Sequence, residues 1–389
     1  MSTAPGLVVV GGSIAGVRAV EAARAAGWTG AITLITAESQ LPYDRPPLSK
    51  DLLAPNGAID PPTLRDEAAW RELDARVRTG VTATGLDPVA KVVITSDGDV
   101  PYASLVITTG GAARSLPGAL TMRDYADAKY VRSALDNART VLVVGAGFIG
   151  AEVATAARAR NLDVIVVDAA PLPLGRAVGD IGGEALAAVH RAGGVDLRLG
   201  TTITAEGPAG VTLSDGTSVR PDAIIAGIGA LPATQWLQGS GIELHAPTGA
   251  VVADSTLATN LPDVWVAGDA AIIDGELGQH WVTAADQGRI AGMNAASSEA
   301  QAWSGVAFAW SHWYGHRIQY VGECRGEEDL FLPGEGVSGV ILTRDGDRFA
   351  GALAIDRPGD AAKARRLVAA GTSWADALEA YSAVASSAS

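Results

Sequence analysis

The residues with the clearest chemical meaning in this chain are two glycine-rich segments, each directly after a short apolar run. The first is Gly-Gly-Ser-Ile-Ala-Gly at residues 11–16, and the second is Gly-Ala-Gly-Phe-Ile-Gly at residues 145–150. A turn of this composition lets the chain leave a strand tightly and aims the amide groups at the start of the next helix at a pyrophosphate. Both segments therefore indicate the binding of a dinucleotide.

The first segment lies inside a strand–helix–strand pattern. Residues 7–10 are apolar, the alanine-rich residues 17–26 read as a helix, and residues 31–36 form a second apolar run that leads to Glu38. A carboxylate at that place accepts hydrogen bonds from a ribose diol. The middle glycine of the usual fingerprint is replaced by Ser13, whose small side chain still permits close approach of a phosphate. The residues predicted to bind here are Gly11, Gly12, Ser13, Ala15, Gly16 and Glu38.

The second segment repeats the pattern without modification. Its second strand, residues 163–168, ends on Asp168, close to the spacing of ~20 residues that such folds show. An acid there binds the 2′-hydroxyl of NADH and repels the 2′-phosphate of NADPH, so we expect NADH, although the nearby Arg176 offers a partner for a phosphate. The residues predicted to bind here are Gly145, Gly147, Phe148, Ile149, Gly150, Asp168, Arg176 and Gly229.

Two dinucleotide sites in one chain predict hydride transfer between two bound cofactors. A nicotinamide delivers two electrons together as hydride, whereas a flavin can release them one at a time. The pairing therefore favours FAD at one site and NADH at the other, with a one-electron acceptor downstream.

Composition narrows the class of protein further. The 389 residues suggest two or three domains, and 48% hydrophobic against 19% charged residues suffices for packed cores. A formal net charge of −14 repels phosphate backbones, so we expect no nucleic-acid partner. The apolar runs fall short of a membrane span and no leader pattern opens the chain, which favours a cytoplasmic protein with no membrane partner.

From residue 7 to about 367 the chain resembles the FAD- and NADH-dependent ferredoxin reductases of bacterial oxygenase and cytochrome P450 systems, the relatives of putidaredoxin reductase. The most specific match is Leu-Pro-Tyr-Asp-Arg-Pro-Pro-Leu-Ser-Lys at residues 41–50. The resemblance implies that this segment covers the flavin, that Lys50 approaches its reactive edge, and that Glu152 is the partner of that lysine. A buried pair of this kind holds a cation where negative charge develops.

The same resemblance implies further contacts. The Thr-Gly pair at 109–110, the Gly-Asp pair at 268–269 and the segment at 280–288 match stretches that hold the flavin in the family. Trp310 matches an aromatic residue beside the flavin and nicotinamide, and it could equally be a core aromatic. With Lys50, Glu152 and Trp310 expected to support catalysis, the additional cofactor-binding residues are Arg45, Lys50, Val81, Thr109, Gly110, Arg123, Gly268, Asp269, Trp281, Val282 and Trp310.

The chain departs from the family pattern at several of these places. His312 and Trp313 stand where the family usually has Asp and Gln, and Ala233 replaces an Asn. Residues 110–114 lack the usual proline before arginine. These departures bear on partner choice and nicotinamide placement rather than on the fold.

The cysteine and histidine content argues against a disulfide reductase and against a metal site. The single cysteine, Cys324, excludes a redox-active disulfide within the chain and reads best as a small buried residue. His312 and His316 lack further candidate ligands, so we expect no metal site. A rubredoxin reductase, or a flavin-binding redox sensor without efficient turnover, stays open as an alternative to a ferredoxin reductase.

The predicted fold class is α/β, with two Rossmann-like dinucleotide-binding domains and a smaller α+β C-terminal domain. We expect a discontinuous FAD-binding domain at residues 1–112 and 242–302, an NADH-binding domain at 113–241, and the C-terminal domain at 303–389. The best local basic group for docking an acidic carrier protein lies in that last domain and comprises Arg357, Lys363, Arg365 and Arg366.

Overall fold

The computed structural model describes residues 5–207, 210–278 and 280–385. Its contacts divide the chain into two compact units. The first unit comprises Met1–Pro47, Pro61–Ala112 and Ala230–Gly305, and the second comprises Leu48–Asp60, Ala113–Gly229 and Val306–Ser389.

The first unit is built on a sheet whose central strands are parallel. The apolar β1 pairs with β2 on one side and with β6 on the other, and β18 adds to β6 in parallel. The chain reaches β6 through an antiparallel meander of β4 and β5. The strands of this sheet are β1 (Gly6–Val10), β2 (Ile32–Ile35), β3 (Ala75–Arg78), β4 (Ala83–Asp87), β5 (Val92–Thr95), β6 (Val100–Ile107) and β18 (Val264–Val266).

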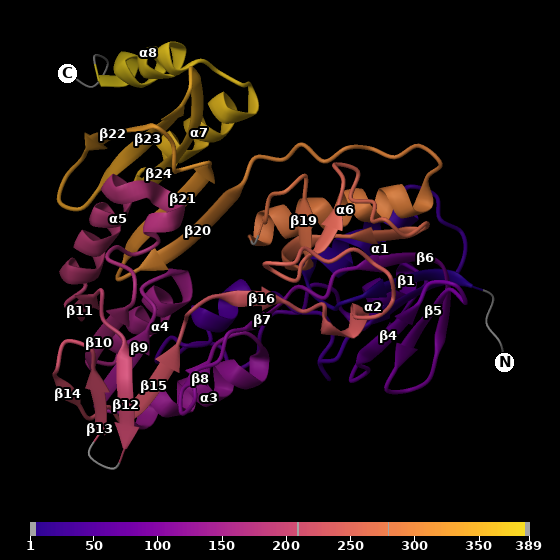
Figure 1. Ribbon diagram of the computed structural model, residues 1–389, viewed down its shortest axis with the longest axis horizontal. Helices are drawn as coiled ribbons and strands as arrows, with labels where there is room; N and C mark the ends of the chain where they lie inside the picture. The colour runs from indigo at the N-terminus through magenta and orange to yellow at the C-terminus, as the bar shows by residue number, and fades with distance from the viewer. Residues whose placement is uncertain (1–4, 208–209, 279, 386–389) are drawn as a thin grey trace. The chain divides into compact units, whose positions relative to one another are not determined.

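Two helices, α1 (Ile14–Ala25) and α6 (Trp281–Ala296), lie side by side in this unit (Figure 1). They approach closely because glycine faces backbone: a Cβ at Gly288 would stand 2.2 Å from the Ala15 carbonyl oxygen, and one at Gly292 would stand 2.1 Å from that of Ala19. The contact brings the first turns of α1 beside the middle of α6. The remaining elements of this part are α2 (Glu67–Glu72), β7 (Gly111–Ala113), β16 (Ala230–Pro232), η2 (Gln235–Leu237), β17 (Val251–Ala253), η3 (Gly268–Ala270) and β19 (Ala271–Ile273), and η1 (Pro46–Ser49) runs across the division between the units.

The second unit contains its own parallel sheet, in the order β11-β10-β9-β15-β8. Val141, Leu142 and Val143 of β9 are fully buried, as expected for a strand covered on both faces. The elements are β8 (Leu120–Thr121), α3 (Tyr125–Asn137), β9 (Thr140–Val144), α4 (Phe148–Arg158), β10 (Asp163–Asp168), α5 (Gly175–Ala192), β11 (Asp196–Leu199) and β15 (Ala223–Ala226), with a small antiparallel sheet of β12 (Ile203–Gly207), β13 (Gly210–Leu213) and β14 (Ser218–Val219).

The C-terminal part of the second unit is an antiparallel sheet in the order β20-β21-β24-β23-β22, against which α7 and α8 pack (Figure 1). Its β20 also packs on α4, so the second glycine-rich unit and this sheet share a core that includes Trp313. The elements are β20 (Phe308–Trp313), β21 (His316–Gly322), β22 (Glu328–Pro333), β23 (Gly339–Asp345), β24 (Arg348–Ile355), α7 (Pro358–Ala369) and α8 (Trp374–Ala385).

The predicted fold class is confirmed: there are two glycine-rich parallel-sheet units and an α+β C-terminal part. The predicted domain boundaries stay a prediction. Among the residues described, no helix combines the length and the apolar character needed to cross a membrane.

Candidate functional site

The first glycine-rich turn stands at the carboxyl end of β1 and depends on the absence of side chains. Gly11 has φ +123°, and a Cβ on it would lie 2.1 Å from the Thr108 carbonyl oxygen. A Cβ on Gly16 would lie 2.0 Å from the Gly11 carbonyl oxygen. The turn therefore brings the first amide groups of α1 out at the end of the sheet, where the helix dipole favours an anion.

Three predicted residues of the first unit meet beside this turn. Arg45 Nη2 donates to Glu38 Oε1 at 2.6 Å, and its Nε donates to Ser13 Oγ at 3.3 Å. The hydroxyl of Tyr43 donates to the other Glu38 oxygen. A carboxylate keeps acceptor capacity beyond these bonds, so Glu38 can still accept from a ribose diol. Arg45 and the start of α1 together supply positive potential for a pyrophosphate.

Two buried hydroxyls in the first unit make no hydrogen bond within the described part of the chain. They are Thr109 Oγ1, just beyond β6, and Thr283 Oγ1, in the first turn of α6. A buried hydroxyl without a bond costs free energy unless another molecule supplies one. Both positions are therefore suited to a polar ligand, and Thr109 is a residue that the sequence predicted.

The Gly-Asp pair follows β18 at the same end of the sheet. Gly268 has φ +74°, and its N–H donates to Gln287 Oε1 of α6 at 2.9 Å. This bond holds the short η3 helix against α6 and leaves Asp269 partly exposed. Trp281, at the start of α6, is 37% exposed and donates from Nε1 to Asp44 Oδ1 at 2.7 Å.

The other predicted residues of the first unit are placed as follows. Val282 is half-buried next to Trp281, and Val81 is buried with its N–H bonded to the Thr36 carbonyl oxygen. Gly110 has φ +67° and accepts from the Ala233 N–H at 2.8 Å. Burial lowers the pKa of His280, which immediately precedes α6, although Asp269 acts in the opposite direction.

The second glycine-rich turn obeys the same steric logic. A Cβ on Gly145, whose φ is +103°, would lie 2.4 Å from the Gly227 carbonyl oxygen, and one on Gly150 would lie 1.8 Å from that of Gly145. Gly147 caps α4, and a Cβ on it would meet only one atom within 4 Å outside its chain neighbours, a Leu174 methyl carbon at 3.4 Å. A dinucleotide backbone can therefore approach at Gly147.

Asp168 is fixed at the end of β10 by two backbone donors. Its Oδ2 accepts from the Ala146 N–H at 2.8 Å, and its Oδ1 accepts from the Ala170 N–H at 2.8 Å. The carboxylate is thereby tied to the glycine-rich turn itself. Arg176 is exposed near the start of α5, and Gly229, with φ +93°, follows β15 with no atom near the place of a Cβ.

A buried histidine contacts the backbone of the second glycine-rich turn. His190 of α5 is fully buried, with Nε2 3.3 Å from the Ala146 carbonyl oxygen and Nδ1 2.8 Å from the Tyr314 hydroxyl. Burial lowers the pKa of His190 to about 4, against smaller opposite effects of Ala146 and Asp168. The imidazole is therefore neutral at physiological pH.

The predicted lysine–glutamate pair is present within the second unit. Lys50 Nζ lies 2.8 Å from Glu152 Oε1, and the Glu152 side chain is only 4% exposed. Ser311 Oγ donates to the same oxygen at 2.5 Å, while Ser49 Oγ donates to Oε2. Three donors therefore surround one buried carboxylate, as a buried charge requires.

Trp310 stands beside this pair. Its ring centroid lies 5.1 Å from Lys50 Nζ, within the range of a cation–π contact. The ring is half-buried and meets His312 edge-on at 5.7 Å. Burial, followed by the charges of Arg317 and Lys50, lowers the pKa of His312.

The structure thus groups the predicted residues into three sets. Ser13, Glu38 and Arg45 contact one another in the first unit, Asp168 contacts the second turn, and Lys50, Glu152 and Trp310 form one cluster. Arg123 precedes α3, and its backbone N–H donates to Asp127 Oδ2 at 2.8 Å.

Sequence reasoning did not name Tyr43, Ser49, Ser311 or Thr283 as site residues. Tyr43 and Ser49 stand in the segment at 41–50 that carried the resemblance, and Ser311 follows Trp310 directly. Because these three residues stand in or beside recognised motifs, the sequence could have pointed to them. Thr283 was marked only by its place in the segment at 280–288.

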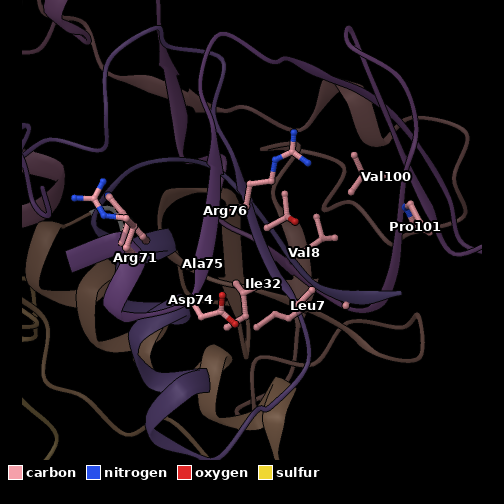
Figure 2. A pocket seen from close by; sticks show the side chains of 13 residues that line it. Leu7, Val8, Ile32, Arg71, Asp74, Ala75, Arg76, Val100 and Pro101 are labelled. Carbon is pink, nitrogen blue, oxygen red and sulfur yellow. The ribbon is translucent and has the colours of Figure 1, made fainter. Parts of the chain in front are cut away.

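A cavity of about 380 Å³ lies at the opposite, amino ends of the first unit's strands (Figure 2). Leu7, Ile32 and Ala75 mark where β1, β2 and β3 begin at this cavity, and Arg76 and Asp74 border it. Its lining, as far as the described residues define it, contains none of the predicted site residues.

Cys324 is buried, and burial raises the pKa of its thiol to about 12, so the thiolate form is disfavoured. Over the described ranges, no group of three His, Cys, Asp or Glu side chains is placed to hold a metal ion.

The fold and these sites define a two-dinucleotide oxidoreductase: two glycine-rich turns on separate parallel sheets, each with an acid in place, and a buried lysine–glutamate pair. Comparison with known families agrees. Residues 5–288 match the model described as pyridine nucleotide-disulphide oxidoreductase, and residues 308–385 match the one described as reductase C-terminal.

Individual relatives and solved structures indicate the kind of reductase more closely than the family models do. The chain is 33% identical to the ferredoxin–NAD(+) reductase subunit of a benzene 1,2-dioxygenase system of Pseudomonas putida, over 94% of this chain and 92% of that one. It is 31% identical to rhodocoxin reductase of Rhodococcus erythropolis, over 93% and 89% of the two chains.

Among structures, the ferredoxin reductase for the CYP199A2 system of Rhodopseudomonas palustris aligns with a TM-score of 0.88 at 27% identity, covering 95% of this chain and 96% of the other. The putidaredoxin reductase of a covalent complex with putidaredoxin aligns with a TM-score of 0.87 at 26% identity, over 95% and 94%. The chain belongs to the ferredoxin reductase family within the pyridine nucleotide-disulphide oxidoreductases. Its cofactors are FAD and NADH, and the glycine cradles and unpaired hydroxyls described above fit such groups.

Proposed function

We propose that this chain is an NADH-dependent ferredoxin reductase that passes single electrons to a small iron–sulfur ferredoxin serving an oxygenase or a cytochrome P450. The observation that carries the proposal is the buried pair of Lys50 and Glu152 in a chain with two glycine cradles. The names of the relatives, which are reductases for ferredoxins and rhodocoxin, support the choice of acceptor.

In the first unit, we propose that the residues hold FAD. The amide groups beyond Gly11 and the guanidinium of Arg45 bind the pyrophosphate, while Glu38 accepts from the ribose. Thr109 and Asp269 are proposed to bind the rest of the cofactor, because one has an unpaired buried hydroxyl and the other a partly exposed carboxylate at the same sheet end. The remaining proposed FAD contacts of this unit are Gly12, Ser13, Ala15, Gly16, Val81, Gly110, Gly268, Trp281 and Val282. Arg123, which belongs to the second unit, stays a predicted cofactor contact.

In the second unit, we propose that the residues hold NADH. Gly147 admits the pyrophosphate and Asp168 accepts from the adenosine ribose. Arg176 is exposed near the start of α5, whereas the carboxylate of Asp168 is held in place and favours the unphosphorylated nucleotide. The remaining proposed NADH contacts are Gly145, Phe148, Ile149, Gly150 and Gly229.

The bound cofactors supply the redox chemistry, since NADH gives a hydride and FAD can release electrons singly. The chain contributes position and charge. Glu152, fixed by Ser49 and Ser311, keeps the ammonium of Lys50 in one place, and Trp310 covers that ammonium on another side. A fixed cation stabilises negative charge that develops near it, and no residue has to act as a nucleophile.

We further propose the domain division predicted from the sequence, with FAD bound by residues 1–112 and 242–302, NADH by 113–241, and a C-terminal domain from 303. We also propose a cytoplasmic location. The reducing compartment accords with a single cysteine that is buried.

The test is an anaerobic titration of the purified protein with NADH and, separately, with NADPH, followed in the visible spectrum. We expect flavin bands that bleach with about one equivalent of NADH. Ferricyanide, putidaredoxin and a rubredoxin are then added as acceptors. Reduction of putidaredoxin well above rubredoxin supports the proposal. A protein that takes up no FAD contradicts it, and slow bleaching with no transfer to either protein indicates a redox sensor.

A further inference from the structure

The buried carboxylate of Glu152 is connected to a residue in which this chain departs from its family. Trp313 is fully buried, and its Nε1 donates to Ser311 Oγ at 2.8 Å. Ser311 Oγ in turn donates to Glu152 Oε1 at 2.5 Å, the oxygen that also meets Lys50. One chain of hydrogen bonds thus runs from the indole of Trp313 to the ammonium of Lys50.

The direction of this chain is fixed by the donors available. An indole nitrogen can only donate, whereas a serine hydroxyl has a single proton and two acceptor lone pairs. Because Trp313 fills one lone pair of Ser311, the hydroxyl proton is left to point at Glu152. Without the indole N–H, the Ser311 hydroxyl could rotate and cease to donate to the carboxylate.

The ring of Trp313 is itself held in place. Phe148, the first residue of α4, meets it edge-on with centroids 5.9 Å apart, and His190 of α5 lies at 5.1 Å. Glu152 is also on α4, one turn beyond Phe148. The same helix therefore carries the carboxylate and one wall of the tryptophan site, so a shift of the ring is transmitted to a residue one turn away.

We propose that Trp313 and Ser311 are positioning residues that fix the Glu152 carboxylate, and through it the Lys50 ammonium, for the reduction of FAD by NADH. The inference rests on the proposed function for the role of Lys50 in that step. The hydrogen-bond chain itself is a property of the protein alone and can be tested without cofactor turnover.

The first test measures how firmly Lys50 is held. Trp313→Phe keeps the ring and removes only the N–H, and Ser311→Ala removes the hydroxyl. We expect acetic anhydride to acetylate Lys50 at least about threefold faster in either variant than in the wild type, measured by mass spectrometry on apoprotein and holoprotein. Lys91, which pairs with Asp263 at 2.6 Å elsewhere, serves as the internal reference.

The second test follows flavin reduction by NADH in a stopped-flow instrument. We expect the rate constant to fall by about fivefold in Trp313→Phe, the size that one net hydrogen bond implies, with the dissociation constant for NADH unchanged. Trp303→Phe is the matched control, because its indole N–H also donates, to Asp286 at 2.9 Å, but outside this chain of bonds. The control should retain the wild-type rate constant.

A double-mutant cycle with Glu152→Gln distinguishes positioning from general damage. If Trp313 acts through the carboxylate, Trp313→Phe causes no further slowing in the Glu152→Gln background. The proposal is overturned if the slowing is the same in both backgrounds, or if Lys50 acetylation and flavin reduction both stay at wild-type values in Trp313→Phe. Failure of the proposed function looks different, since the wild type itself would then not be reduced by NADH.

Discussion

At the scale of single residues, the proposed role of Asp168 in coenzyme choice rests on how the second glycine-rich turn holds its carboxylate. Its carboxylate accepts from the N–H groups of Ala146 and Ala170, so the negative charge stands at a fixed place. A 2′-phosphate brought there meets an immobile like charge, whereas a hydroxyl finds an acceptor. We therefore propose that the preference for NADH depends on this one side chain.

We predict that Asp168→Asn lowers the ratio of kcat/KM for NADH to that for NADPH by about 10- to 100-fold, because the repelling charge is removed. Steady-state reduction of ferricyanide with each nucleotide gives the ratio. Asp163→Asn, at the exposed start of the same strand, is the control and should leave the ratio unchanged. A wild type that prefers NADPH would contradict the assignment of Asp168.

His190 gives a second prediction at this scale, which concerns stability. Its pKa of about 4 in the folded protein lies below the ordinary value of 6.5, so between these values the unfolded chain binds the proton more readily. Stability is complete above pH ~6.5 and is lost as the pH falls toward ~4. We expect the wild type to lose about 2–3 kcal/mol more than His190→Gln on going from neutral pH to pH ~4.5.

Urea unfolding at the two pH values measures this difference. His245→Gln is a suitable control, because that histidine is only partly buried and bonds to Thr248 in a surface turn. The expectation is wrong if the wild type and His190→Gln lose the same stability. The neutral imidazole would then not be what holds Ala146 and Tyr314 together.

The sequence predicts a site residue well when its position is set by neighbouring residues in the chain, and poorly when its partner is distant in sequence. The acids Glu38 and Asp168 follow strands at a fixed spacing, and the structure places both beside their glycine-rich turns, although their cofactor contacts stay predictions. The partners Ser311 and Trp313 reach Glu152 across more than 150 residues of sequence, as the separation of 159 between Ser311 and Glu152 shows. No local pattern encodes a contact of that kind.

At the scale of elements, the segment of residues 48–60 belongs with the second unit although it follows the first glycine-rich region in sequence. Two arginines hold it. Arg160, after α4, donates to the Leu53 carbonyl oxygen at 2.5 Å, and Arg132 of α3 donates to those of Leu52 and Ala58 at 3.1 and 2.7 Å. Since this segment carries Lys50, the arginines place its backbone on the second unit.

The sequence predicted the helices and strands better than it predicted the position of residues 48–60. Parallel strands with glycine-rich turns are encoded by local apolar runs, so β1, β9 and β10 were found where expected. Residues 48–60 contain no periodic pattern, and their position comes from backbone carbonyls that accept from distant guanidinium groups. Because these bonds involve only the backbone of the segment, its amino-acid composition does not predict them.

We predict that Arg160→Ala loosens residues 48–60 selectively. Arg160 is 8% exposed and also pairs with Asp136 at 2.7 Å, so its removal takes away the donor to the buried Leu53 carbonyl oxygen and one cationic partner of Asp136. Amide hydrogen exchange in peptides that cover 48–60 should accelerate by about 10-fold or more, with little change in β9 and β10. Arg191→Ala, an exposed position on α5, serves as the control. Uniform acceleration over the whole chain would argue against a local clamp.

At the scale of the whole molecule, the formal net charge of −14 opposes docking of an acidic carrier unless basic residues gather locally. Of the basic group Arg357, Lys363, Arg365 and Arg366, fewer side chains are available for docking than the sequence indicates. Lys363 donates to the Ala380 carbonyl oxygen at 3.1 Å and lies 4.4 Å from the Tyr381 ring centroid, and Arg365 lies over Phe308. Lys363 therefore supports the packing of α8, and Arg366 is the exposed charge best suited to a partner.

We predict that Arg366→Glu slows reduction of putidaredoxin by about three- to tenfold at low ionic strength and leaves reduction of ferricyanide unchanged. A rim charge acts mainly on the association rate, so the difference should shrink as salt is added. Arg76→Glu changes the net charge equally at the cavity in the first unit and controls for the overall field. Equal slowing of both acceptors by Arg366→Glu, or the same effect from Arg76→Glu, would place the carrier elsewhere than on α7.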